Sequence, residues 1–195
     1  MILRTLLLIV FLGGSPLMAE DRVLFNFENA EAAKQWQPVN DGVMGGRSDG
    51  RFKINEDNNM EFFGTLSLEN NGGFASVRSR ETKLGLEKGD SIVIRVRGDG
   101  RDYKLRLDVP RSVSRNSYRQ SFKTKKDEWV EVTLPIEKFL ATWRGRVFPN
   151  EKFNPSNVTG MGIQLSDNNP GPFKLEVEWI KASQLTPQTS NPDSN

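Results

Sequence analysis

Short stretches in which apolar and polar residues alternate run through most of this chain. In residues 92–96 every second position is Ile or Val, and in residues 103–109 every second position is Tyr, Leu or Val. Alternation of period two buries one face of a strand and leaves the other in water. About ten such segments with almost no helical periodicity predict an all-β fold, an antiparallel β-sandwich or jelly roll. The inward positions predict a core of Ile92, Ile94, Val96, Leu105, Leu107, Val130, Val132, Leu134, Ile163, Leu175 and Val177.

Turn residues between the segments predict how the strands pair. Gly98-Asp99-Gly100 separates two alternating segments, so we expect a hairpin there. That hairpin would place four cations, Arg95, Arg97, Lys104 and Arg106, on one solvent-facing surface. A second pair is expected between residues 118–122 and 129–134, and residues 139–153 are expected to form a long connection. Residues 31–36 fit one short helical turn.

The two ends of the chain carry different signals. Arg4 precedes an apolar run over residues 6–12, which helix-breaking residues and then Ala19 follow. This order is typical of a secretory signal peptide, and the run is shorter than the roughly 20 residues of a membrane span. We expect a signal peptide at 1–19, one domain at 20–183 and a disordered, Pro- and Ser-containing tail at 184–195. The protein is then exported, periplasmic or secreted, with no membrane span after cleavage; an uncleaved anchor is the alternative.

Missing residue types exclude several functions. The chain has no Cys and no His, which removes disulfides, thiolate nucleophiles, Cys/His zinc sites and His-containing triads. The acidic residues show no glycosidase or calcium pattern, although a structural calcium at the Asp-Gly turns is an alternative. Lys and Arg number 27 and Asp and Glu 25, a balance that does not suggest a nucleic-acid partner. We therefore expect a binding module, not an enzyme, without catalytic residues, cofactor or metal.

Two regions are candidates for binding. The glycine-rich loop at residues 41–48 either packs over the sandwich or holds an anion through backbone N–H groups. Residues 95–126 contain eleven Lys and Arg against three Asp, which fits either a solvated sheet face or a basic surface for an acidic partner. Trp129 and Trp143 are aromatic platforms or core anchors.

Three motifs occur together in this order: residues 39–48, which follow Trp36, then residues 63–78, and then residues 97–103. In this order and spacing they strongly resemble the complex I intermediate-associated protein 30 family, over about residues 23–182. The resemblance implies a galactose-binding-domain-like jelly roll and a chaperone-like, non-enzymatic role in the assembly of respiratory NADH dehydrogenase. The positions carried over as the family's signature are Asp41, Gly45, Gly46, Ser48, Gly72, Gly73, Phe74, Arg78, Asp99, Arg101 and Tyr103.

Two functions of different classes follow. The first is an assembly module whose partner is a protein, such as a subunit of a membrane complex. The second is a carbohydrate-binding module of the cell envelope, which would need two or more exposed rings in a groove. The candidate binding residues are Asp41, Gly45, Gly46, Ser48, Arg78, Arg95, Arg97, Asp99, Arg101, Tyr103, Lys104 and Arg106. The sequence does not fix the oligomeric state.

Overall fold

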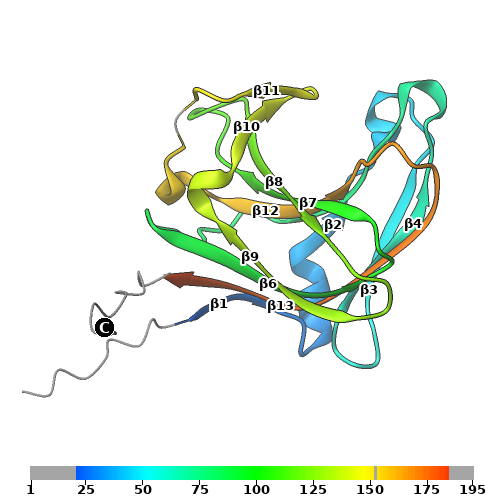
Figure 1. Cartoon of the computed structure of the whole chain (residues 1–195), viewed down its shortest axis with the longest axis horizontal. Helices are drawn as coiled ribbons and strands as arrows, with labels where there is room; N and C mark the ends of the chain where they lie inside the picture. Colours follow the sequence, from blue (N-terminus) through cyan, green and yellow to red (C-terminus); the bar gives the residue numbers. More distant parts are fainter. Residues whose placement is uncertain (1–20, 152, 185–195) are drawn as a thin grey trace, which may run out of the picture.

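The computed structural model describes residues 21–151 and 153–184; the segments predicted as signal peptide and tail lie outside this part, apart from Gln184. Within it, the strands form two antiparallel sheets (Figure 1). Sheet A contains β1 (Arg22–Asn26), β3 (Asp49–Ile54), β4 (Met60–Leu66), β6 (Asp90–Gly98), β9 (Trp129–Pro135) and β13 (Gly171–Gln184). Sheet B contains β2 (Trp36–Pro38), β5 (Ala75–Ser79), β7 (Asp102–Asp108), β8 (Ser117–Lys123), β10 (Leu140–Trp143), β11 (Arg146–Phe148) and β12 (Gly160–Leu165).

The order of strands is that of an antiparallel sandwich with crossovers. The strand order of sheet A is β3-β4-β13-β6-β9. β4 pairs with residues 171–177 of β13, and β1 pairs with residues 179–182 of the same strand. The strand order of sheet B is β11-β10-β8-β7-β12-β5-β2. Short 3-10 helices connect them: η1 (Ala30–Gln35), η2 (Asp41–Met44), η3 (Glu69–Asn71), η4 (Ile136–Lys138) and η5 (Pro155–Asn157). None of the helices in the described ranges has the length and apolarity that crossing a bilayer requires.

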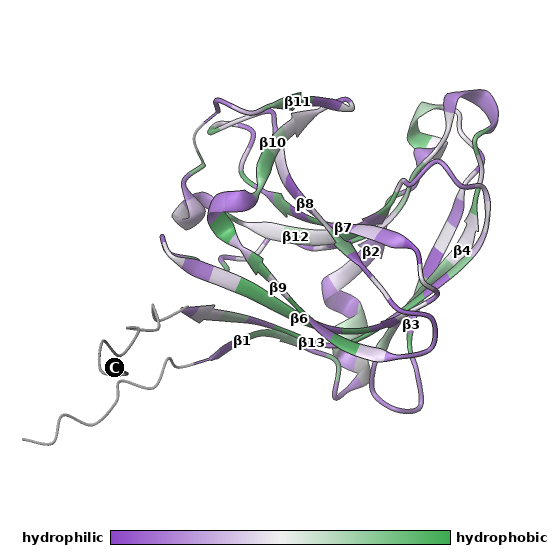
Figure 2. Cartoon of the chain, viewed as in Figure 1, coloured by the Kyte–Doolittle hydropathy of each residue, from purple (hydrophilic) through white to green (hydrophobic). Residues whose placement is uncertain are grey.

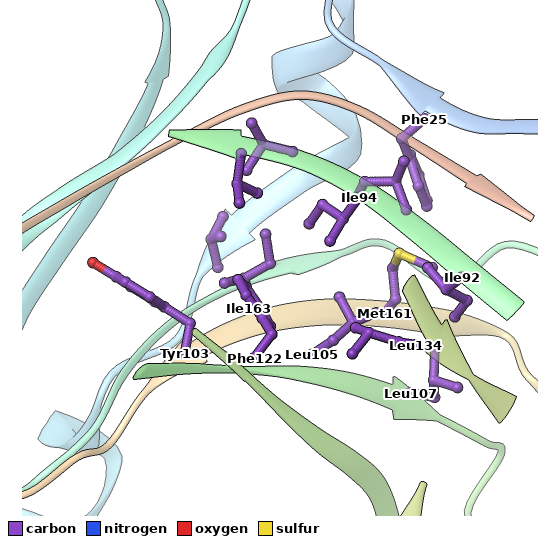
Figure 3. Packing of buried hydrophobic residues seen from close by; sticks show 14 of the residues in the cluster. Phe25, Ile92, Ile94, Tyr103, Leu105, Leu107, Phe122, Leu134, Met161 and Ile163 are labelled. Carbon is purple, nitrogen blue, oxygen red and sulfur yellow. The ribbon is translucent and has the colours of Figure 1, made fainter. Parts of the chain in front are cut away.

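The core lies between the sheets, as the alternation predicted. Ile92 and Ile94 of β6 face Leu105 and Leu107 of β7 across the interior (Figure 3). Of the predicted core residues, Val130 and Val132 are half-buried and the others are fully buried. Residues of opposite hydropathy alternate along single strands (Figure 2), because one side of each sheet packs on the core and the other meets water. This confirms the predicted β-sandwich.

The predicted strand pairing is wrong at several places. β6 pairs with β13 and β9 in sheet A, whereas β7 pairs with β8 and β12 in sheet B. β8 and β9 also lie in different sheets. Alternation identifies the inward face of a strand but not the sheet that carries it, and a short turn joins strands across the core as well as within a sheet. The four cations therefore lie on opposite outer faces of the molecule, Arg95 and Arg97 on sheet A, Lys104 and Arg106 on sheet B.

The segment predicted as a long connection contains a hairpin. β10 and β11 pair with Trp143 opposite Arg146, and the turn residues Arg144 and Gly145 have φ of 47° and 80°. Two positive φ values are what a tight hairpin turn requires. Arg is an unusual residue at such a position, so the turn signal in the sequence was weak. The hairpin extends sheet B beyond β8.

Candidate functional site

The first motif forms a clasp around a buried carboxylate. Asp41, at the start of η2, is fully buried. It accepts hydrogen bonds from the backbone N–H of Ser48 (2.9 Å), the hydroxyl of Ser48 (2.6 Å) and the backbone N–H groups of Gly73 (2.7 Å) and Phe74 (3.1 Å). Burial alone would raise the pKa of Asp41, but these four donors outweigh it and lower the pKa. The clasp ties the segment before β3 to the segment before β5, and thus sheet A to sheet B.

Glycines make room for this clasp. A Cβ at Gly46 would collide with the carboxylate of Asp41, and one at Gly72 would come within 2.7 Å of its Oδ2 atom. Gly45 ends η2 with a φ of 90°, in the left-handed region that favours glycine. The N–H groups of Ser48, Gly73 and Phe74 are therefore used within the fold, on Asp41. The structure places these loop residues in a structural role.

The third motif forms a corner between the sheets. Arg101 donates from Nε and Nη2 to the two oxygens of Asp167, at 2.9 and 2.7 Å, and also donates to backbone carbonyls of residues 169 and 172. The carboxylate of Asp99 accepts from the Tyr103 hydroxyl (3.1 Å) and from the Lys174 N–H (3.0 Å). Burial, then the charge of Asp99, raises the pKa of Tyr103 far above its ordinary value. These groups satisfy one another and hold the loop after β12 against the start of β7.

The outer face of sheet A pairs its cations with carboxylates. Arg97 bonds to Glu176 at 2.7 Å, and Arg95 contacts Glu178 and also Glu131, the latter at 3.3 Å. Hydrogen bonds to Glu176 and Glu178 raise the pKa of Arg97 and Arg95 respectively. Trp129 lies on this outer face and not in the core. The guanidinium groups of Arg95 and Arg97 lie 5.5 and 5.0 Å from the centroid of its ring. Its face toward these cations is already in use.

The outer face of sheet B is arranged differently. The registers place Arg78 of β5, Gly162 of β12, Arg106 of β7 and Arg119 of β8 in one row across the sheet. A Cβ at Gly162 would lie 2.9 Å from Arg78 Cγ, so glycine leaves room for the Arg78 side chain. Arg106 binds Asp108 (Nη2 to Oδ1, 2.6 Å). Arg78 and Arg119 donate only to serine hydroxyls, each at 3.2 Å, and form no ion pair with any residue of the described chain.

A second row lies beside the first. Ser76, Gln164, Lys104 and Ser121 follow one another across β5, β12, β7 and β8. Lys104 donates to the Ser166 hydroxyl at 2.9 Å and makes no ion pair within 21–151 and 153–184. The side chain of Gln164 is 4% exposed, and its Oε1 atom has no hydrogen-bond partner in the described structure. A buried amide oxygen without a donor is costly unless water or a ligand supplies one.

These rows form the floor of a groove. The part over both rows has a volume of about 650 Å³, and a second hollow of about 790 Å³ continues past Arg106 toward Trp143. In Figure 1, the β10–β11 hairpin and the segments near β4 rise on opposite sides of the face that β8, β7 and β12 form. Exposed apolar side chains stand along the groove: Met44, Leu140, Trp143 and Val147.

Cations dominate this groove. Among the described residues that line it, the one carboxylate is Asp108, and the cations are Arg78, Lys104, Arg106, Arg111, Arg115, Arg119, Lys138 and Arg144. Burial, then the charge of Arg106, lowers the pKa of both Arg78 and Arg119 to about 10. Burial, then the charge of Arg119, lowers the pKa of Lys104. We refer to this surface, with Arg78, Lys104, Arg119 and Gln164 at its centre, as the sheet B groove.

The groove is rich in groups that bind anions. With no His or Cys in the sequence, it presents guanidinium and ammonium donors, an amide and hydroxyls. Among the described residues, no three or more acidic side chains converge as the ligands of a metal ion would. Guanidinium groups form charge-assisted, bidentate hydrogen bonds to carboxylates and phosphates. The arrangement is suited to holding an anion.

The structure divides the predicted binding residues among four places. Asp41, Gly45, Gly46 and Ser48 form the clasp; Asp99, Arg101 and Tyr103 form the corner; Arg95 and Arg97 lie on sheet A; Arg78, Lys104 and Arg106 line the sheet B groove. Sequence reasoning missed Arg119 and Gln164 as site residues. Arg119 was visible as an outward position between Tyr118 and Gln120, but its neighbours in space are set by sheet register. Gly160 and Gly162 alternate with the buried residues Met161 and Ile163. Glycines at outward positions of a strand indicate that a neighbouring side chain passes close over the backbone, as Arg78 does at Gly162.

Comparison with known proteins identifies relatives. A family model described as Complex I intermediate-associated protein 30 matches residues 25–177. The mouse protein "Complex I intermediate-associated protein 30, mitochondrial" is 30% identical, with 86% of this chain and 58% of the mouse protein covered. The Drosophila melanogaster protein of the same name is 24% identical, over 83% of this chain and 62% of that protein. The chain thus spans less than two thirds of the length of these curated relatives.

Solved structures share the fold at low sequence identity. A family 11 carbohydrate-binding module from Clostridium thermocellum, solved with a β-1,3-1,4-mixed-linked tetrasaccharide, has a TM-score of 0.58 and 14% identity, covering 83% of this chain and 94% of that one. An agarase matches with a TM-score of 0.60 at 9% identity, over 85% of this chain and 25% of the agarase. Likeness at this identity establishes the β-sandwich fold alone.

The predicted export is contradicted by the relatives. Proteins from mouse, Caenorhabditis briggsae, Caenorhabditis elegans and Drosophila are all named as mitochondrial. The prediction depended only on the residue types of the N-terminal segment, an apolar run that follows one basic residue. Residue types alone do not show in which compartment the relatives are found. Residues 1–19, on which it depended, lie outside the described part of the chain.

Proposed function

The chain belongs to the Complex I intermediate-associated protein 30 family, and from this membership we propose that it is a non-enzymatic module that binds protein subunits during assembly of NADH dehydrogenase. The observation that carries the proposal is the extent of the family match, which runs from β1 into β13 and therefore includes both sheets. The names of the relatives describe association with intermediates of complex I. The sheet B groove supports a binding role, since hydrogen-bond donors dominate its described lining.

The cations of the groove favour a protein partner over a neutral polysaccharide. A sugar-binding groove is expected to present two or more aromatic rings, whereas the described lining of this groove has one exposed ring, Trp143, with the Arg144 guanidinium 5.0 Å from its centroid. A neutral glycan would also remove water from Arg78 and Arg119 without supplying a counter-charge, which is unfavourable. We therefore propose a protein partner and include carbohydrate binding as an outcome that the experiment can detect.

The test uses cells that carry this gene. A tagged chain is purified in mild detergent and separated on native gels, beside untagged cells and a tagged unrelated β-sandwich. We expect the chain to migrate with partly assembled NADH dehydrogenase, and deletion of the gene to lower the amount of complete enzyme. Recovery without any NADH dehydrogenase subunit, together with normal assembly after deletion, would overturn the proposal. Retardation on β-glucan gels would point instead to the carbohydrate function.

A further inference from the structure

The sheet B groove contains cations that the fold leaves without counter-charges. Arg106 and Arg119 lie directly opposite each other on β7 and β8, and like charges in that arrangement destabilise a sheet. Asp108 forms an ion pair with Arg106, and its charge also acts at longer range on Arg78 and Arg119, whose pKa values are nevertheless lowered. Arg78, Arg119 and Lys104 have no carboxylate partner in the described residues, although Arg95, Arg97 and Arg101 elsewhere in the molecule all have one. An anion from outside would relieve this repulsion.

The spacing of the cations indicates the shape of that anion. The backbones of Arg78 and Arg119 are three strand steps apart, or roughly 14 Å at about 4.8 Å per step. Lys104 precedes Arg106 by two residues on β7, or roughly 7 Å along the strand. A compact anion such as a single phosphate could reach one or two of these groups. An extended peptide places side chains on one face about every 7 Å, which matches the spacing along β7.

The backbone of the floor argues against a phosphate site. Phosphate sites commonly use free N–H groups of a loop or a helix N-terminus. The floor strands β12, β7 and β8 are central in sheet B and pair on both sides. Recognition must therefore come from side chains, and the guanidinium fork is matched to carboxylates.

The walls add a second requirement. Leu140 and Val147 lie on the β10–β11 hairpin, Met44 lies on η2 opposite, and all three are exposed while lining the groove. A cationic floor between apolar walls is complementary to a segment that alternates carboxylate and apolar side chains. A single-stranded nucleic acid would instead need several aromatic faces on which successive bases stack, whereas Trp143 is the one exposed ring among the described residues of the lining.

We propose that the sheet B groove binds an extended acidic segment of a partner protein, with carboxylates on Arg78, Arg119 and Lys104 and apolar side chains against Met44, Leu140 and Val147. The inference rests on the proposed function, because it names the part of a partner subunit that the module holds.

The test measures binding of a fluorescent peptide of about eight residues, alternating Glu and Leu, to the full chain by anisotropy. The decisive variant is Arg78→Gln with Arg119→Gln, which we expect to weaken binding roughly 10- to 100-fold, since each loses a charge-assisted contact. The matched control is Arg51→Gln with Arg95→Gln, which removes the same charge from sheet A and should change affinity less than threefold. Circular dichroism melting verifies that both variants fold.

Further probes distinguish other ligands. A Gln–Leu peptide of equal length should bind at least tenfold more weakly than the Glu–Leu peptide. The proposal is overturned if the two peptides bind equally, if both double variants lose affinity alike, or if pyrophosphate, a single-stranded oligonucleotide or the mixed-linked tetrasaccharide binds the groove more tightly than the acidic peptide. If the groove does not prefer the acidic peptide but the chain still migrates with assembly intermediates, the groove assignment is wrong and the proposed function stands.

Discussion

The two outer faces of the sandwich treat the same residue type in opposite ways. On sheet A, Arg95 and Arg97 bond to Glu178, Glu131 and Glu176, and the hydrogen bonds to Glu178 and Glu176 raise their pKa. On sheet B, Arg78 and Arg119 have serine hydroxyls and no ion pair in the described chain, and burial together with neighbouring cations lowers their pKa. Arg95 and Arg97 have their carboxylate partners within sheet A, whereas Arg78 and Arg119 have none among the described residues.

The difference separates residues that maintain the fold from residues available for binding. The clasp at Asp41 and the corner at Arg101 use all their polar contacts internally, like the ion pairs of sheet A. The sheet B groove retains donors whose partners are missing from the fold. Perturbed charges in a concave surface are a sign of a binding or functional site.

The largest effect should come from removing the clasp that supports one wall of the groove. Asp41→Ala leaves the Ser48 hydroxyl and the N–H groups of Gly73 and Phe74 without an acceptor. We expect the free energy of unfolding to fall by about 3–4 kcal/mol, measured by urea denaturation. Asp49→Ala, at an exposed ion pair with Arg51, serves as control and should cost less than about 1 kcal/mol. Equal losses in the two variants would contradict a structural clasp.

A smaller loss should follow when sheet A is made incomplete. Glu176 is 5% exposed and accepts from Arg97 and Lys174. Glu176→Gln should destabilise the fold by about 2–3 kcal/mol, because Arg97 loses its carboxylate partner and Lys174 keeps only Glu61. Burial by itself would raise the pKa of Glu176, but Arg97 and Lys174 lower it below its ordinary 4.5. The stability that the carboxylate supplies is therefore full above pH 4.5 and is lost as the pH falls through the folded pKa. The variant should be less acid-sensitive than the parent; parallel pH profiles would refute this.

Alkaline pH should affect the arginines of the sheet B groove and not those of sheet A. Arg78 and Arg119 have pKa values of about 10 in the fold against an ordinary 12.5. Their unfavourable charge is fully present below pH 10 and is relieved as the pH rises toward 12.5, so their contribution to stability increases over that window. Affinity for the acidic peptide should be level from pH 7 to about 9 and fall roughly tenfold by about pH 11. Constant affinity across this range would show that these cations do not hold the peptide.

The smallest effect compares one arginine from each face. Arg119→Gln should leave the free energy of unfolding unchanged or raise it by no more than about 1 kcal/mol, because it removes a cation that faces Arg106 without a counter-charge. The melting temperature should therefore stay the same or rise. Arg95→Gln removes an ion pair and should lower the melting temperature slightly. Differential scanning calorimetry resolves both. A clear loss of stability in Arg119→Gln would mean that Arg119, like Arg95, is stabilised by groups within the fold.

The sequence contained the core and the motifs but not the arrangement of the faces. Alternation assigned Ile92 and Leu105 to the interior correctly because the period of side-chain direction is a local property. It could not tell that Gly98-Asp99-Gly100 crosses between sheets, since that depends on Thr124 and Lys174, which bind the turn from distant segments. The basic segment 95–126 was recognised as unusual, yet Arg78 and Arg119 come together only through the register of β5, β12, β7 and β8.

The most direct measurement of the difference between the faces is a map of amide chemical shifts in the ¹⁵N-labelled chain during titration with the Glu–Leu peptide. The account predicts that shifts concentrate in residues 76–78, 104–106, 119–121 and 162–164 and along the β10–β11 hairpin, while β6, β9 and β13 stay unchanged. Shifts that concentrate instead around Arg95, Arg97 and Trp129 on sheet A would contradict it.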